Sequence, residues 1–189
     1  MNTKKFIISI MGLLLTTSLL KAELFRLEIG GSLFYPSEKA FREIYGPGIK
    51  YSVDISRNIW KKIELHVEVS YFYKHGQLTF TGERTAVRII PWGVHVRYPF
   101  LEKKINFYAG AGLIYTSFQE KNPIGRVKGD KLGYTIKIGG FKRIKVLKKY
   151  VKEFIIDFCL SYHYCEMRPA EIKFDAGGLD LGLALGYEF

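Results

Sequence analysis

Two histidines, His66 and His95, are the first residues whose types and spacing could do chemistry. Imidazole nitrogens are common metal ligands, and Glu64 or Glu68 could supply a carboxylate beside them. These residues lack the tight ligand spacing of an established metal motif. The simpler interpretation is that both histidines are hydrogen-bonded side chains inside the fold. We therefore predict no bound metal and no other cofactor.

A second candidate is the segment His163-Tyr164-Cys165, in which a histidine two positions before a thiol could activate it as a nucleophile. No carboxylate follows at a spacing that completes such an arrangement. Matches of two residues are common by chance. We do not predict an enzyme on this basis.

A third group consists of charged residues that recur at alternate positions within apolar segments. If they share an enclosed interior they must pair, because a buried carboxylate without a partner costs several kcal/mol or takes up a proton. We interpret them as a structural network rather than an active site or a proton path. The set comprises Arg26, Glu28, Lys50, Asp54, Glu64, Glu68, Arg97, Lys137, Asp157, Asp180 and Glu188.

The elements that must position these groups are clearest in the last segment, which runs from Gly177 to Phe189. From Leu179 onward, large apolar residues occupy every odd position and small or charged residues every even one. A period of two predicts a strand. A helix would scatter the apolar residues around its circumference, and each interior glycine would cost it roughly 1 kcal/mol. So long an apolar face ending in aromatics favours a strand that faces lipid.

Seven further segments alternate in the same way, at 24–34, 49–57, 63–73, 86–98, 105–118, 132–141 and 154–165. We predict an all-β, eight-stranded antiparallel up-and-down transmembrane β-barrel with both termini on the periplasmic side. Pro91 cannot donate to a ladder, so we expect a bulge there and a change of side-chain parity before it. The alternative is a soluble β-sandwich or lipocalin-like barrel with the opposite side-chain orientation.

The connections support the barrel, since polar stretches of roughly ten residues follow the first, third, fifth and seventh strands and shorter ones follow the second and fourth. The basic segment 142–152 is predicted to be strand extension plus a solvated turn. Lys121, Arg126, Lys128 and Lys131 of the third loop would suit lipid phosphates, although solvated charge is the simpler interpretation. Aromatic girdles are expected at the periplasmic ends (Trp60, Tyr98, Phe107, Phe154, Tyr187 and Phe189) and at the opposite ends (Phe34, Tyr73, Tyr115, Phe118, Tyr162 and Tyr164).

Residues 1–22 have the layout of a cleaved signal peptide, with Lys4 and Lys5 before an apolar run too short to span a membrane. Residues 23–189 would then form the barrel. The formal net charge of +11 on an exported chain points to anionic lipid and lipopolysaccharide as partners and not to nucleic acid. Cys159 and Cys165 lie too far apart along one strand for a disulfide, so we expect free thiols facing the interior.

The segment VRYPFLEKKINFYAGAGLIYTSF and the terminal Phe189 resemble the small eight-stranded bacterial outer-membrane β-barrels, including the OmpA membrane domain and the OmpW type. The resemblance implies a monomer that is carried by periplasmic chaperones and inserted by the outer-membrane assembly machinery, with Tyr187 and Phe189 as the assembly signal. It also implies a location in the outer membrane. Because the chain stops at Phe189, we expect no peptidoglycan-binding domain after the barrel.

Three functions follow from these expectations. The first is a structural or surface-interaction barrel with a plugged, charge-paired lumen, because eight strands enclose a space that side chains fill. The second is a narrow channel for small hydrophobic compounds of the OmpW kind. The third, least supported, is a lipid A enzyme, since His163 and Cys165 faintly resemble the His-x-Ser of outer-membrane lipid A deacylases, with cysteine in place of serine.

Overall fold

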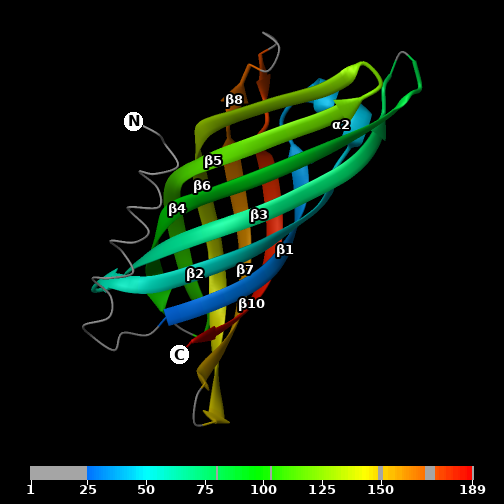
Figure 1. The fold of residues 1–189 in the computed structure, drawn as a ribbon. Helices are drawn as coiled ribbons and strands as arrows, with labels where there is room; N and C mark the ends of the chain where they lie inside the picture. Colours follow the sequence, from blue (N-terminus) through cyan, green and yellow to red (C-terminus); the bar gives the residue numbers. More distant parts are fainter. Residues whose placement is uncertain (1–24, 80, 103, 149–150, 169–172, 189) are drawn as a thin grey trace.

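Eight antiparallel strands close into a barrel in the order in which they follow along the chain (Figure 1). The computed structural model describes residues 25–79, 81–102, 104–148, 151–168 and 173–188. Because the last strand pairs with the first, each barrel strand has a neighbour on both sides. The predicted eight-stranded up-and-down barrel is therefore confirmed. Its strands are β1 (Phe25–Pro36), β2 (Gly48–Trp60), β3 (Ile63–Gln77), β4 (Arg84–Glu102), β5 (Asn106–Asn122), β6 (Gly125–Lys148), β7 (Val151–Tyr164) and β10 (Gly178–Glu188).

The expected signal peptide, residues 1–22, lies outside the described residues, as does Phe189 of the expected assembly signal. Tyr187, the other residue of that signal, is exposed on β10. Both predictions therefore stay predictions.

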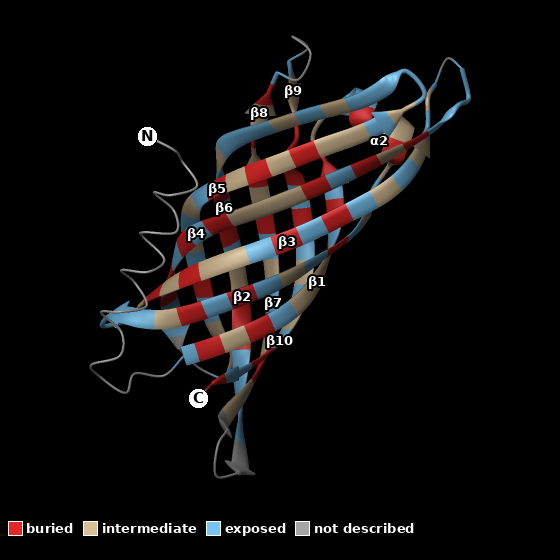
Figure 2. Cartoon of the chain, in the orientation of Figure 1, coloured by how far each residue is buried: buried red, intermediate tan, exposed pale blue. Residues whose placement is uncertain are grey.

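Side chains alternate between the outside and the inside of the barrel along each strand, as the bands of Figure 2 show. On β10, Leu181 and Leu183 are 63% and 58% exposed, whereas Asp180 is 2% exposed. A contiguous apolar exterior of this kind suits hydrocarbon and not water. The soluble alternative, which would place these leucines in a central cavity, is wrong.

The two ends of the barrel differ. The termini end, which carries Phe25 and Glu188, holds the short connections between β2 and β3, β4 and β5, and β6 and β7. The opposite, loop end carries the helix α2 (Lys39–Tyr45) and a small hairpin of β8 (Glu166–Met167) and β9 (Phe174–Asp175). Across the described residues, helices fall short of the length and apolarity needed to cross a membrane.

The first connection was expected to be a polar loop, and that prediction is wrong because α2 forms within it. Phe41 and Tyr45 are four residues apart, so one helical turn brings both rings onto the same face. Both are buried in the mouth of the barrel. The sequence suggested a polar loop because the apolar residues of this segment follow the period of a helix and not that of a strand.

The connection between β5 and β6, the third in the chain, is shorter than expected. The ladder between β5 and β6 continues to the pair Asn122 and Gly125, which leaves only Pro123 and Ile124 as the turn. Alternation fades there because a strand in water needs no apolar face, although its backbone bonds persist. At the other end, β6 continues to Lys148 and β7 begins at Val151, so the strand extension predicted for the segment 142–152 is confirmed. The predicted turn falls on residues 149–150, outside the described residues, and stays a prediction.

Pro91 does not shift the register as expected. Its pairing with Thr116 lies within a continuous register between β4 and β5, and side-chain parity is the same on both sides of it. On the β3 side the ladder is interrupted only between the pairs Val69–Trp92 and Phe72–Ile89, which share one register. The proline therefore removes a ladder bond without inserting a residue.

The predicted aromatic girdles are wrong for two residues. Phe34 and Phe118 are 3% and 4% exposed, because their parity places them on the inner face of β1 and β5. Trp60, Tyr98 and Tyr187 are exposed on the outside as expected.

Candidate functional site

The candidate site is the lumen network, the eleven charged residues that the sequence singled out. All of them lie on the inner face of the barrel; ten are 7% exposed or less, and the side chain of Glu68 is 17% exposed. They come from seven of the eight strands, so closure of the barrel is what brings them together.

At the termini end, Arg26 binds Glu64 through two parallel contacts, with Nη1 3.2 Å from Oε2 and Nη2 2.9 Å from Oε1. This bidentate geometry is the strong form of an ion pair. The guanidinium also packs over the ring of Phe141 at 4.7 Å. Arg143 lies at the mouth, 3.5 Å from Glu188 and 3.8 Å from Glu64. Sequence reasoning missed Arg143 because the predicted strand ended at Phe141; two more residues of alternation would have found it.

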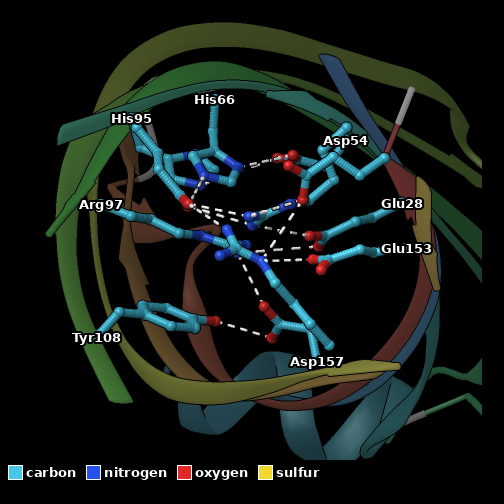
Figure 3. A network of polar contacts seen from close by, with 12 residues as sticks. Glu28, Asp54, His66, His95, Arg97, Tyr108, Glu153 and Asp157 are labelled. Carbon is cyan, nitrogen blue, oxygen red and sulfur yellow. Dashed lines mark hydrogen bonds and ion pairs between the residues drawn. The ribbon is translucent and has the colours of Figure 1, made fainter. Parts of the chain in front are cut away.

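At mid-height, Arg97 and Asp157 form the centre of the network (Figure 3). Arg97 Nη1 donates to Asp157 Oδ2 over 2.9 Å and lies 3.8 Å from Glu28 Oε2. The hydroxyl of Tyr108 donates to the other oxygen of Asp157 over 2.8 Å, and its ring stacks under Arg97 at 4.5 Å. Both oxygens of Asp157 are thus satisfied.

Toward the loop end, Lys137 pairs with Glu68 and Lys50 pairs with Asp180. His163, a buried residue of β7, joins the second pair with its Nε2 2.8 Å from Asp180 Oδ2. Each lysine of the network therefore has a carboxylate of its own.

His66 and His95 are direct cross-strand partners on β3 and β4, and their rings stack with centroids 4.8 Å apart. His66 Nδ1 lies 2.7 Å from Asp54 Oδ1, and its Nε2 lies 3.2 Å from Glu64 Oε2. His95 Nε2 lies 3.8 Å from Asp54 Oδ2. The structure thus brings the two predicted histidines together, but with Asp54 as the carboxylate that joins them.

His163 and Cys165 do not form the nucleophile and base of the enzymatic hypothesis. The histidine contacts Asp180 and Ser161 inside the barrel, while the Cys165 sulfur lies 3.6 Å from the backbone oxygen of Lys131. Cys159 and Cys165 are both free thiols, as predicted.

Above the charges, the loop end of the lumen holds a cluster of buried apolar side chains that β1, α2, β3, β4 and β5 share with the loop-end hairpin. Phe34 and Phe72 meet edge to face at 5.1 Å in its centre. We call this the apolar cap. It comprises Phe34, Phe41, Tyr45, Phe72, Val87, Ile89, Phe118, Cys165, Met167 and Ala176.

Little open space is left between these groups. A cavity in the lumen beside Lys50, Asp157 and Asp180 has a volume of about 40 Å³, and two smaller ones near His95 and under Phe72 have about 10 Å³ each. A larger apolar hollow of about 260 Å³ opens at the loop end between α2 and Phe118, and Phe41, Tyr45 and Phe118 of the cap form part of its wall.

No family model matches the sequence, and the search of curated proteins found no match. Solved structures do match over most of the chain. OprG of Pseudomonas aeruginosa has 13% identity and a TM-score of 0.69, covering 89% of this chain and 97% of its own. Neisserial surface protein A has 13% identity and a TM-score of 0.65, covering 87% and 97%.

Escherichia coli outer membrane protein W has 14% identity and a TM-score of 0.52, and the match covers 90% of this chain and all of that protein. At such identities the likeness shows the fold alone. The closed barrel and its apolar exterior agree with the fold of these neighbours. The chain therefore has the fold of the small eight-stranded β-barrels of the bacterial outer membrane, such as OprG and OmpW.

Proposed function

We propose that this chain is an integral outer-membrane barrel whose interior is plugged, and that it acts through its surface as a structural or interaction protein. The observation that carries the proposal is the filling of the lumen, where ion pairs and the apolar cap leave cavities of about 40 Å³ or less. A cavity of that size holds a few waters at most. A hydrated ion has no continuous path through such an interior.

Planar-bilayer recording tests the plug. The refolded chain is expected to insert without conductance steps, while a porin added to the same bilayer provides the positive control. A variant with Arg97 and Asp157 both changed to serine removes the central pair and should conduct weakly if the network is the barrier. Regular conductance from the native chain would contradict the plugged lumen.

The surface role is supported by an outward basic patch above the lipid-facing band, formed by Arg88, Lys121, Arg126 and Lys128. Ladder pairing aligns Arg88 with Gln119 and Lys128, and places Lys121 opposite Arg126. All four basic residues are exposed.

Below this patch on the same outward face, Trp92 and Tyr115 pack together at 5.3 Å, with Leu132 as the next partner. Aromatic residues at such a position mark a membrane interface. From Tyr115 to Lys121 is about 20 Å along the strand. The patch therefore lies where the phosphates of outer-leaflet lipopolysaccharide would meet it.

Lipid binding tests this surface. We expect the native chain to retain bisphosphorylated lipid A in native mass spectrometry, and a triple variant (Lys121→Ser, Arg126→Ser and Lys128→Ser) to lose most of it. The matched control changes Lys61, Lys142 and Lys145 to serine, three exposed lysines at the termini end. Equal loss in both variants would show a net-charge effect and contradict the patch.

A second function, passage of small hydrophobic compounds, is favoured by one observation, the hollow of about 260 Å³ lined by Phe41, Tyr45, Phe118 and Phe174. The apolar cap and the lumen network lie beneath it. Binding of N-phenyl-1-naphthylamine that Phe118→Ser abolishes, together with its transfer into proteoliposomes, would favour this function over a sealed barrel.

A further inference from the structure

Asp54, His66 and His95 lie on three consecutive strands, β2, β3 and β4, with their side chains in the lumen (Figure 3). His66 pairs with His95 across one ladder and with Ser56 across the other, so Asp54 is the diagonal neighbour of His66. Such neighbours are close enough for side-chain contact. One potential ligand atom from each of the three residues falls within 4.8 Å of the others.

Two atoms of this group lack a hydrogen bond to any residue that the structure describes. His95 Nε2 and Asp54 Oδ2 are buried without a hydrogen bond and lie 3.8 Å apart. The side chains are 2% and 7% exposed, so water does not satisfy them from bulk. In the tautomer that carries its proton on Nδ1, His95 would turn an unprotonated Nε2 toward this carboxylate oxygen, and the two atoms could then share a cation.

The charge balance of the lumen network also favours a bound cation. The network contains seven carboxylates but four permanent cations, and each of these cations is paired with a carboxylate: Arg26 with Glu64, Arg97 with Asp157, Lys137 with Glu68 and Lys50 with Asp180. Arg143 at the mouth adds one further cation, beside Glu188, so carboxylates still outnumber cations. Asp54 instead contacts the two imidazoles. A divalent cation at Asp54 would offset much of the surplus negative charge.

We propose that Asp54, His66 and His95 bind one divalent transition-metal ion inside the barrel. Two imidazole nitrogens and one carboxylate oxygen suit Zn²⁺ and its first-row neighbours, whereas Mg²⁺ and Ca²⁺ prefer oxygen ligands throughout. Ligand atoms about 2.1 Å from such an ion are at most about 4.2 Å apart. Binding therefore draws the three side chains slightly together. Glu64, 3.2 Å from His66 Nε2, orients that ring from the outer shell.

A glycine on the neighbouring strand leaves room for His95. Gly112 of β5 is the cross-strand partner of His95, and a Cβ on Gly112 would meet the His95 Cβ at 2.3 Å. The missing side chain is what lets the His95 imidazole take its place in the lumen.

The experiment uses the chain refolded in detergent, with Cys159 and Cys165 changed to serine so that thiols cannot bind the probe. Co²⁺ is supplied during refolding, so entry into the closed lumen does not limit binding, and folding is checked by heat-modifiable gel migration. We expect one tightly held Co²⁺ per chain, with a visible ligand-field band that Zn²⁺ displaces. Loss of an outer-shell group costs 10–100-fold in affinity, so His66→Gln or His95→Gln should weaken binding by about 100-fold or more.

The chain's other two histidines provide matched controls. His163 is also buried and lies beside Asp180, but Lys50 contacts the same oxygen of that carboxylate and Ser32 donates to the other one. His75 is exposed at the loop end. His163→Gln and His75→Gln should bind Co²⁺ as the parent does. If a His66 or His95 variant fails to fold, the site is tested with the double variant His75→Gln and His163→Gln. This variant keeps only the proposed pair of histidines and must still bind one ion. A folded parent that takes up no Co²⁺, or a double variant that loses it, overturns the site, whatever the bilayer recordings show.

Discussion

Arg97 and Asp157 are 60 residues apart in the chain and meet in the lumen, where Arg97 Nη1 donates to Asp157 Oδ2 over 2.9 Å. Arg97 leaves β4 and Asp157 leaves β7, so the pair spans the interior and not a ladder. Tyr108 and Glu28 complete their surroundings. This ion pair links two strands that are not neighbours in the barrel, and it makes the stability of the barrel depend on both partners.

Removal of one partner should be costly. Arg97→Met leaves Asp157 buried without its ion-pair partner and Glu28 with Arg26 alone, and we expect the free energy of unfolding to fall by about 3–5 kcal/mol. Urea unfolding in lipid vesicles measures it. Adding Asp157→Asn to that variant should recover part of the loss. Lys39→Met, which breaks the exposed pair with Glu43, should cost about 0.5 kcal/mol or less. Equal losses in Arg97→Met and Lys39→Met would contradict a buried network.

The cost of a charge introduced on the exterior should depend on its depth in the membrane. Leu183 lies near the middle of β10 and is 58% exposed to the surroundings of the barrel. Leu183→Arg is expected to lower the free energy of unfolding in vesicles by about 2–4 kcal/mol. Leu179→Arg, near the loop end of the same strand, should cost about 1 kcal/mol or less. A protein whose exterior faces water would tolerate both substitutions alike.

A methyl group at Gly112 should disturb the barrel. The added Cβ would meet Val94 O and the His95 Cβ at 2.3 Å, so β4 and β5 must separate. We expect Gly112→Ala to destabilise the barrel by about 1–3 kcal/mol and to weaken Co²⁺ binding. Gly31→Ala is the control, because its nearest neighbour, Lys50 O, lies at an ordinary 3.9 Å. A neutral Gly112→Ala would show that the strands adjust without strain.

The loop-end hairpin should loosen in acid. Hydrogen bonds from Lys173 and then from Tyr164 lower the pKa of Glu166 below its usual value. A lowered pKa in the folded state means that the stabilisation is complete above the usual glutamate pKa and is lost as the pH falls through the lowered one. Amide exchange of Met167, corrected for the intrinsic rate, should rise between pH 6 and pH 3. Glu166→Gln should remove this pH dependence, and the same rise in that variant would assign it to another group.

Much of the fold could be predicted because a strand in a barrel has a period of two and one lipid-facing side. Leu181 and Leu183 alternate with Asp180 and Gly182, and that alone indicated which side chains point inward. The errors arose where the pattern has another period or none. Phe41 and Tyr45 follow a helical spacing, and the outer part of β5 and β6 stands beyond the apolar band. Phe34 and Phe118 were placed by their proximity to strand ends and not by parity, which turns them into the apolar cap.

The sequence by itself determined the strand count, the inner face and the eleven charges on it, because parity is a local property of the extended backbone. Which charge meets which was decided only by the tertiary structure, since partners such as Arg97 and Asp157 depend on barrel closure and on the stagger between distant strands. The same holds for Asp54 beside His66 and His95, whose contact depends on the register of two ladders at once. Alternation specifies a direction for each side chain, but only closure specifies its height and its neighbour.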